Sequence, residues 1–199
     1  MQMQTFPQLP SSVWAVSKGH SKLDPGAFGQ GSNEYAQISP VVNYMEVIWS
    51  QQALGPLYVP HEADELPARV GLIQTVRLIN AQKVKGTIEL HFNAATNKHR
   101  RGGEVYYKEG SVVGGKKLAE TIAARLRVWY PDVPCKVLPD TASYVGWLYF
   151  VRRTHAVAAL VEPCFLSNVQ DFNYLVGHWK ALAETLCQGL GDFSKARGW

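Results

Sequence analysis

The chain has 199 residues, of which 46% are hydrophobic and 18% are charged. This length and composition suit one domain with a sizeable core and argue against a second independent domain. The formal net charge is +4 and the isoelectric point is about 8.9, a mild basic excess. Such an excess suits an anionic polymer such as nucleic acid or cell wall, and it does not discriminate between the two.

The three cysteines are sparse and odd in number, and none belongs to a CxxC pair, so we expect no disulfide framework. Residues 1–12 are polar and lack the charged-then-apolar pattern of a signal region. No apolar run approaches the ~18 residues that a membrane span requires. We therefore expect a protein that is made in the cytoplasm and that needs release by another agent to act elsewhere.

The first predicted element is a buried strand over about 13–18, which opens with the apolar run 13–16. A glycine-rich loop that carries His20 follows, and glycine lets such a loop turn tightly because it tolerates positive φ. A helical pattern then begins at Glu34 and runs to Ala53. Pro40 lies inside this pattern, so we expect either a kink or a late helix start there.

The next predicted elements are a strand at 57–59, a helix from Pro67 to Gly86 and a strand at 87–93. In the last of these, residues alternate between apolar and polar, so that Glu89, His91 and Asn93 share one face. The second half predicts strands at 104–108, 135–138, 148–151 and 156–161, a helix from 116 to about 130, and a helical pair at 168–176 and 178–190.

Strands that alternate with helices predict an α/β fold: a single domain with a central, mostly parallel twisted sheet and helices on both faces. In such sheets the functional site lies beyond the carboxyl ends of the strands. Three apolar strands here end near reactive residues, namely His20, His91 and Glu162. Glu34, at the start of the first helix, joins them, so we expect all four side chains at one edge of the sheet.

His20, Glu34 and His91 form the set of two histidines and one glutamate that suits a catalytic zinc ion, which keeps a fourth position open for water. Glu162 would act as the general base, because the metal lowers the pKa of its water toward ~7 and a nearby carboxylate can then take the proton. Taken singly, each residue also has a structural interpretation. His20 could form hydrogen bonds within its loop, Glu34 could be an acid favoured at a helix N-terminus, and His91 could be a core histidine. Their shared position favours the metal site.

Other reactive residues receive structural interpretations. Cys164 is predicted to be a small packed residue, and the remaining histidines are predicted to be structural or exposed: His61, His99, His155 and His178. The basic loop 98–101 is expected to be a solvated turn, with a second possibility that it forms a lip over the cleft. No nucleic-acid motif is present and the aromatic residues are scattered among core strands, so we expect no nucleic-acid partner.

Three motifs occur in order along the chain. The first reads Gly19-His20, then Asp24-Pro25-Gly26-Ala27, then Glu34; the second runs from Glu89 to Ala94; the third runs from Leu160 to Asn168. Two lesser matches are Arg77 to Asn80 and Gly103 to Tyr107. Together they resemble the zinc-dependent N-acetylmuramoyl-L-alanine amidases, in the branch shared by bacterial autolysins and phage endolysins.

The resemblance implies one zinc ion on His20, Glu34 and His91, with a zinc-bound water as nucleophile and Glu162 as general base and then acid. The implied reaction is hydrolysis of the amide between N-acetylmuramic acid and L-alanine in peptidoglycan, which would be the substrate partner. The implied domain is one catalytic unit over residues 1–199, without a separate wall-binding domain. A monomer is compatible with this picture, and the motifs specify no further substrate-binding residue.

The chain departs from the family pattern at a few positions. Ser17-Lys18 replaces the usual Asp-Pro, Ser21-Lys22 replaces two glycines, and Glu89 replaces the serine of the second motif. Glu89, the single domain and the missing signal region resemble the phage endolysin subgroup, which implies action on the wall after release in phage lysis or by non-standard export. Two alternatives remain: a zinc peptidase that cuts within the stem peptide, and a non-catalytic wall-binding module, which would not need Glu162.

Overall fold

The structure is a computed structural model that describes residues 14–51 and 55–199. Three sequence-based predictions lie partly or wholly outside the described residues: Val13 in the first strand, the polar stretch 1–12, and the end of the first helix at Ala53.

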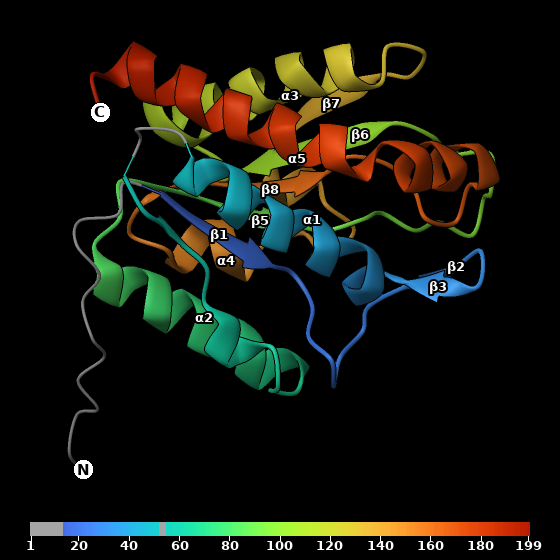
Figure 1. The fold of residues 1–199 in the computed structure, drawn as a ribbon, viewed down its shortest axis with the longest axis horizontal. Coiled ribbons are helices and arrows are strands. Elements are labelled where there is room, and N and C mark those ends of the chain that lie inside the picture. Colours follow the sequence, from blue (N-terminus) through green and yellow to red (C-terminus); the bar gives the residue numbers. More distant parts are fainter. Residues whose placement is uncertain (1–13, 52–54) are drawn as a thin grey trace.

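Six strands form the central sheet, and every neighbouring pair is parallel except β8 with β6 (Figure 1). In sheet order the strands are β4 (Leu57–Tyr58), β1 (Trp14–Lys18), β5 (Gly86–Leu90), β8 (Val157–Glu162), β6 (Gly103–Tyr107) and β7 (Cys135–Pro139). A separate two-stranded ribbon consists of β2 (Phe28–Gly29) and β3 (Ser32–Asn33). The predicted mostly parallel sheet is confirmed.

Helices cover both faces of this sheet, as predicted (Figure 1). One face carries α1 (Glu34–Ser50), α3 (Lys117–Trp129) and α5 (Val169–Arg197), and the other carries α2 (Ala68–Gln82) and α4 (Tyr149–Arg153). The alternation of strand side chains supplies a core to each layer. In β8, for example, Ala159 and Val161 pack toward the first face, and Ala158 and Leu160 toward the second. The described residues also contain three short helical turns: η1 (His61–Ala63), η2 (Val112–Lys116) and η3 (Asp140–Ala142).

The predicted strand at 148–151 is wrong, because residues 149–151 belong to helix α4 and Leu148 is its N-cap. A run of four apolar residues is too short to distinguish a period of two from a period of 3.6. In this helix Phe150 and Val151 are both buried, and the Arg152 guanidinium donates a hydrogen bond of 2.9 Å to the buried carboxylate of Asp140.

Several element boundaries also differ from prediction. Helix α1 begins at Glu34 and continues through Pro40, so there is no late start. Helix α2 ends at Gln82, and Gly86 already belongs to β5. The predicted helical pair is confirmed, since two helical segments of α5 meet at a kink at His178, where φ is −132°, but the second segment extends to Arg197. Strand β5 ends at Leu90, which leaves His91 just beyond it.

The topology places the ends of several strands at one edge of the sheet. Strands β1, β5 and β8 are parallel, so their carboxyl ends share this edge. Strand β6 runs the opposite way, and its first residues therefore reach the same edge, where Glu104 pairs with Glu162. We call this the C-terminal edge; it receives the loops after β1, β5 and β8 and the loop before β6.

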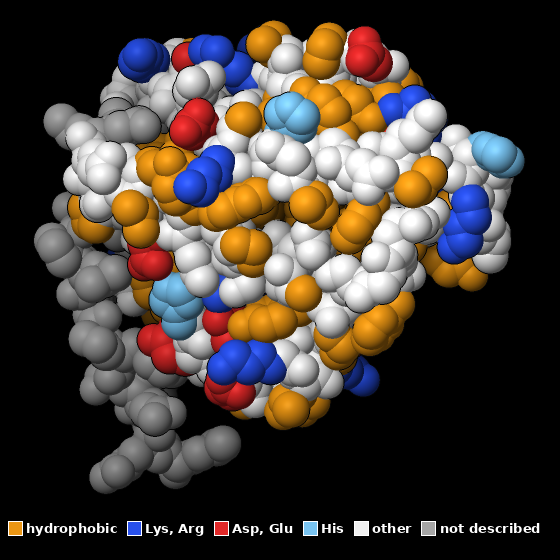
Figure 2. Space-filling model, turned by 45° about the vertical axis from the view of Figure 1, so that its right-hand side comes forward, with side chains coloured by type: hydrophobic (Ala, Val, Ile, Leu, Met, Phe, Trp, Pro, Cys, Tyr) orange, Lys and Arg blue, Asp and Glu red, His pale blue; other side chains and the backbone are white. Residues whose placement is uncertain are grey.

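Charged side chains of both signs are scattered over the face shown in Figure 2, with Lys and Arg lying near Asp and Glu rather than gathered in one patch. Within residues 14–51 and 55–199, none of the helices is both long enough and apolar enough to cross a membrane.

Candidate active site

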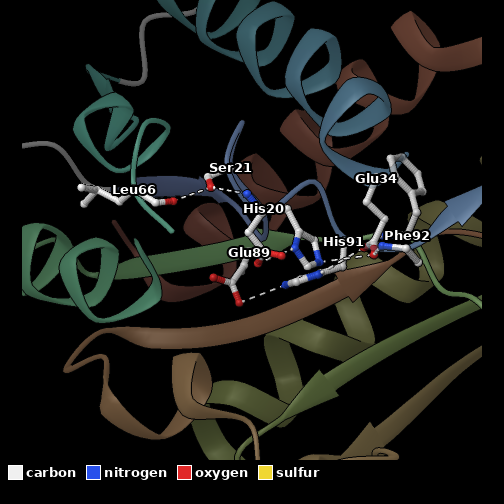
Figure 3. A network of polar contacts seen from close by, with 9 residues as sticks. His20, Ser21, Glu34, Leu66, Glu89, His91 and Phe92 are labelled. Atoms are coloured by element: carbon white, nitrogen blue, oxygen red, sulfur yellow. Dashed lines mark hydrogen bonds and ion pairs between the residues drawn. The ribbon is translucent and has the colours of Figure 1, made fainter. Parts of the chain in front are cut away.

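The three predicted metal ligands converge at the C-terminal edge. One donor atom from each of His20, Glu34 and His91 lies within 4.8 Å of the other two. His20 Nε2 is 3.3 Å from Glu34 Oε2, and His91 Nδ1 is 3.4 Å from Glu34 Oε1. The two imidazole rings meet edge to face with their centroids 4.9 Å apart (Figure 3). Two loops and a helix start, remote in sequence, thus present three donors to one point.

The Glu34 carboxylate is held by the backbone on both oxygens. The Ala27 N–H donates to Oε2 at 2.8 Å, and the Phe92 N–H donates to Oε1 at 3.0 Å. Asn33 caps helix α1 by accepting the Ala36 N–H at 2.9 Å, which fixes the first turn. Burial opposes ionisation, but the hydrogen bonds with the two histidines hold the pKa of Glu34 well below its ordinary value. Glu34 is therefore an oriented carboxylate.

Two glycines allow the histidine rings to approach the backbone. A Cβ on Gly19 would lie 2.0 Å from His91 Nε2, and one on Gly26 would lie 2.6 Å from His20 Cδ2. Gly26 also has φ of +75°, a backbone conformation that L side chains rarely adopt. Both glycines of the first motif are thus required by the space around the cluster.

This cluster fits a zinc ion by donor chemistry and by spacing. Two imidazole nitrogens and a carboxylate oxygen are a donor set found in catalytic zinc sites. Bonds of about 2.1 Å in tetrahedral directions put neighbouring donors roughly 3.4 Å apart. Each histidine nitrogen lies at such a distance from one oxygen of Glu34, His20 Nε2 from Oε2 at 3.3 Å and His91 Nδ1 from Oε1 at 3.4 Å. Burial alone would lower the pKa of His91, but hydrogen bonds with Glu34 and Glu89 raise it well above its ordinary value. The surroundings therefore favour a positive charge here.

Glu162, the predicted base, ends β8 beside this cluster. The His91 N–H donates to the carbonyl of Val161 at 2.9 Å, so Glu162 follows directly on the residue that pairs with His91. Burial is the main cause that raises the pKa of Glu162 to about 7; the charge of His91 opposes the rise, and those of Glu104 and Glu34 add to it. A carboxyl group with a pKa near neutrality can both accept and return a proton.

A hydrogen-bonded chain that the sequence reasoning did not assign holds Glu162. Asn93 Nδ2 donates to Glu162 Oε2 at 2.5 Å and to Glu104 Oε2 at 2.8 Å. Glu104 also accepts from Tyr106 Oη at 2.6 Å and from Arg100 at 2.9 Å. The alternation of apolar and polar residues over 87–93 places Asn93 on the same face as His91, and this pattern could have identified Asn93 as part of the site. No local pattern marks Glu104, which arrives through the antiparallel strand β6.

The basic loop is more firmly anchored than the predicted solvated turn. Arg101 Nε donates to Asp171 at 3.0 Å, and the Asn168 side chain donates to the Lys98 carbonyl at 2.6 Å. The Arg100 guanidinium lies 4.8 Å from the centroid of the Phe165 ring while it bonds Glu104. The loop thus lies against the C-terminal edge beside Glu104, consistent with the predicted lip.

The remaining reactive residues stay outside the cluster, as predicted. Cys164 is fully buried, and its thiol, like those of Cys135 and Cys187, is free. The four other histidines are exposed: His61, His99, His155 and His178.

A cluster of two histidines and a glutamate at the C-terminal edge of a mostly parallel sheet defines an α/β protein with a hydrolase-type metal site. The family model described as N-acetylmuramoyl-L-alanine amidase matches residues 15–192. The chain therefore belongs to the N-acetylmuramoyl-L-alanine amidase family, and it is a cell-wall hydrolase. The enzymes of this family use zinc, in agreement with the cluster. A search of curated proteins gives no match.

Solved structures share the fold at low sequence identity. The N-acetylmuramoyl-L-alanine amidase AmiC2 of Nostoc punctiforme is 21% identical with a TM-score of 0.78, over 92% of this chain and 97% of that one. The catalytic domain of CwlV, an amidase from Bacillus (Paenibacillus) polymyxa, is 18% identical with a TM-score of 0.79, over 92% and 99%. The catalytic domain of CD27L, an endolysin that targets Clostridia difficile, is 20% identical with a TM-score of 0.73, over 90% and 96%.

Proposed function

We propose that this chain hydrolyses the amide bond between N-acetylmuramic acid and L-alanine of peptidoglycan with one zinc ion held by His20, Glu34 and His91. The observation that carries the proposal is the convergence of these three donors within 4.8 Å beside Glu162, in a chain that belongs to the amidase family. Peptidoglycan follows from the family, and the zinc ligands follow from the donor set.

When bound, zinc supplies Lewis-acid activation of water and of the amide carbonyl. The chain's own residues move the protons. Glu162 accepts a proton from the attacking water and then gives it to the nitrogen of the leaving L-alanine, so that the departing group is a neutral amine. Asn93 fixes Glu162 Oε2 through its 2.5 Å hydrogen bond and so orients the carboxylate. The pKa of about 7 lets Glu162 serve in both steps near neutral pH.

The direct test is mass analysis of purified peptidoglycan after digestion with the protein, with and without a chelator. We expect free stem peptides with new L-alanine amino termini, lost on chelation and restored by zinc. Cleavage inside the stem peptide would instead support a zinc peptidase. Bound zinc without cleavage of any peptidoglycan type would support a wall-binding module.

The role of Glu162 is tested by Glu162→Gln, which keeps the shape of the side chain and removes its basicity. Loss of a general base lowers the rate by about 10²–10⁴-fold, and we expect a fall of this size with zinc content unchanged. Glu120→Gln, on the outer surface of α3, is the matched control and should keep full activity. Full lytic activity of Glu162→Gln would rule out this mechanism.

We further propose that the protein is a phage or prophage endolysin that is made in the cytoplasm and reaches the wall after release. The support is Glu89, which occupies the serine position of the second motif. The test is cytoplasmic expression in bacteria, followed by permeabilisation of the inner membrane. We expect turbidity to fall only after permeabilisation. Lysis of intact cells would show that the chain is exported on its own.

A further inference from the structure

Each imidazole of the cluster has a second carboxylate on the nitrogen that does not face Glu34. His20 Nδ1 lies 3.3 Å from Asp24 Oδ2. His91 Nε2 lies 3.3 Å from Glu89 Oε2, and Figure 3 shows these two side chains facing each other. Asp24 belongs to the first motif, whereas Glu89 stands where the second motif has serine. The contact between Glu89 and His91 thus depends on the residue that replaces this serine.

We propose that Glu89 is a positioning residue for His91: it accepts the Nε2–H and thereby holds Nδ1 toward Glu34 and the metal. This inference rests on the proposed zinc site. A carboxylate that accepts the outer N–H of a ligating histidine fixes its tautomer and ring orientation and makes the inner nitrogen more basic. Glu89 would therefore strengthen zinc binding without touching the ion.

The surroundings of Glu89 leave His91 as its partner. Glu89 is 2% exposed, and its register neighbours are Ser17 on β1 and Leu160 on β8. Lys18 lines the same cavity, but its ammonium group bonds Asp64 at 2.5 Å. Among the described residues, His91 is the one hydrogen-bond partner of the Glu89 carboxylate. A buried carboxylate is unfavourable unless it is paired, so this contact accounts for a charge at this position.

Strand geometry explains why a glutamate can make this contact directly. Residues 89 and 91 are two apart in an extended segment, so their side chains leave the same face of the sheet. A serine side chain is two bonds shorter than that of Glu89 and falls short of the far nitrogen of the ring. Gly19 leaves room for the ring, because a Cβ there would lie 2.0 Å from His91 Nε2. Gly19 and Glu89 therefore both lie close to the Nε2 side of the ring.

The experiment compares zinc affinity of the full chain carrying Glu89→Ser or Glu89→Gln, measured by competition with a chromophoric chelator. We expect Glu89→Ser to weaken zinc binding by about 10–100-fold, the usual effect of losing such an outer partner. Glu89→Gln should weaken it less, because the amide oxygen still accepts the N–H but carries no charge. Glu89→Gln also preserves the volume of the side chain, so its zinc affinity can be measured even if Glu89→Ser fails to fold.

The matched control is Glu65→Gln, which removes an exposed carboxylate that pairs with Lys22 and not with His91. Its zinc affinity should be unchanged. A second readout is the ¹⁵N spectrum of His91 in the zinc-bound protein. We expect metal on Nδ1 and a proton on Nε2, with the Nε2–H resonance shifted in both Glu89 variants.

Two results would overturn the inference alone: unchanged zinc affinity in both Glu89 variants, or metal on His91 Nε2, in a chain that still binds zinc and cleaves peptidoglycan. Failure of the unmodified chain to bind zinc would overturn the proposed function and this inference together. The two failures are therefore distinguishable.

Discussion

Glu162 ends a strand whose other residues are apolar, and this position disfavours the charged form of its carboxyl group. The main cause is burial, which raises the pKa of this group to about 7 from an ordinary value of 4.5. Folding therefore favours the protonated acid, whereas the proposed chemistry begins with the carboxylate. A group that is poised for catalysis in this way reduces the stability of the fold.

This conflict predicts a pH-dependent stability difference between the metal-free protein and Glu162→Gln. Because the folded pKa lies above the unfolded one, the contribution of Glu162 to stability is fully present below about pH 4.5 and is lost as the pH rises through about 7. At pH 8 the glutamine variant should be more stable by about 1–3 kcal/mol, since each pKa unit corresponds to about 1.4 kcal/mol and the side chain is partly exposed.

Urea denaturation at pH 5 and pH 8 in the presence of a chelator measures this difference. The gap between the two proteins should widen with pH, while Glu120→Gln, whose carboxylate is exposed, should follow the unmodified chain at both values. A gap that is the same at both pH values would show that Glu162 ionises as freely in the folded chain as in the unfolded one.

Single residues differ in how far the sequence predicts them. His20, Glu34 and His91 follow from motifs, and Glu89 and Asn93 follow from the alternation of one strand, because a period of two places them on the face of His91. Glu104 does not follow from any local pattern. It reaches Glu162 because β6 runs antiparallel beside β8, and that neighbour relation is set by tertiary packing.

Among the elements, the first turn of α5 organises the loops around the site. Asp171 is fully buried there and accepts the N–H groups of Gly102 at 2.9 Å and Phe165 at 3.1 Å. It also accepts from Arg101 Nε at 3.0 Å. One carboxylate thus joins the loop before β6 and the loop after β8 to a helix that packs on the sheet.

We therefore expect Asp171→Asn to lower the free energy of unfolding by on the order of 3 kcal/mol, because a buried charged acceptor with several donors is lost. Urea denaturation at neutral pH measures the loss. The matched control is Asp192→Asn on the same helix, whose partly exposed carboxylate accepts from Arg125 Nε at 2.7 Å. Exposed pairs contribute under about 1 kcal/mol, so similar losses in both variants would contradict the organising role of Asp171.

Most elements follow from the sequence, including the short strands β4 and β7, but one short apolar run does not. Strand β8 and helix α3 lie where the pattern predicts them, and the predicted break in the last helical pair falls at His178. That run is 148–151, most of which belongs to helix α4, and four apolar residues fit either period.

At the scale of the whole molecule, the site consists of segments that only the fold brings together: the loop after β1, the start of α1 and the end of β5. The sequence predicts this meeting through a general rule, since parallel strands share one edge for their carboxyl ends. It does not give the strand order, which places β5 between β1 and β8 and so centres His91 between His20 and Glu162.

Because zinc would join these three segments, its binding should stabilise the entire fold. A ligand that binds only the folded state adds about 2.7 kcal/mol at a free concentration of 100 times its Kd. We therefore expect zinc to raise the Tm of chelator-treated protein, and magnesium, which prefers oxygen ligands, to leave it unchanged. His20→Ala should abolish the zinc increment, whereas His99→Ala, at an exposed position, should keep it. An undiminished increment in His20→Ala would mean that the stabilising zinc binds elsewhere, and the ligand assignment would then be wrong.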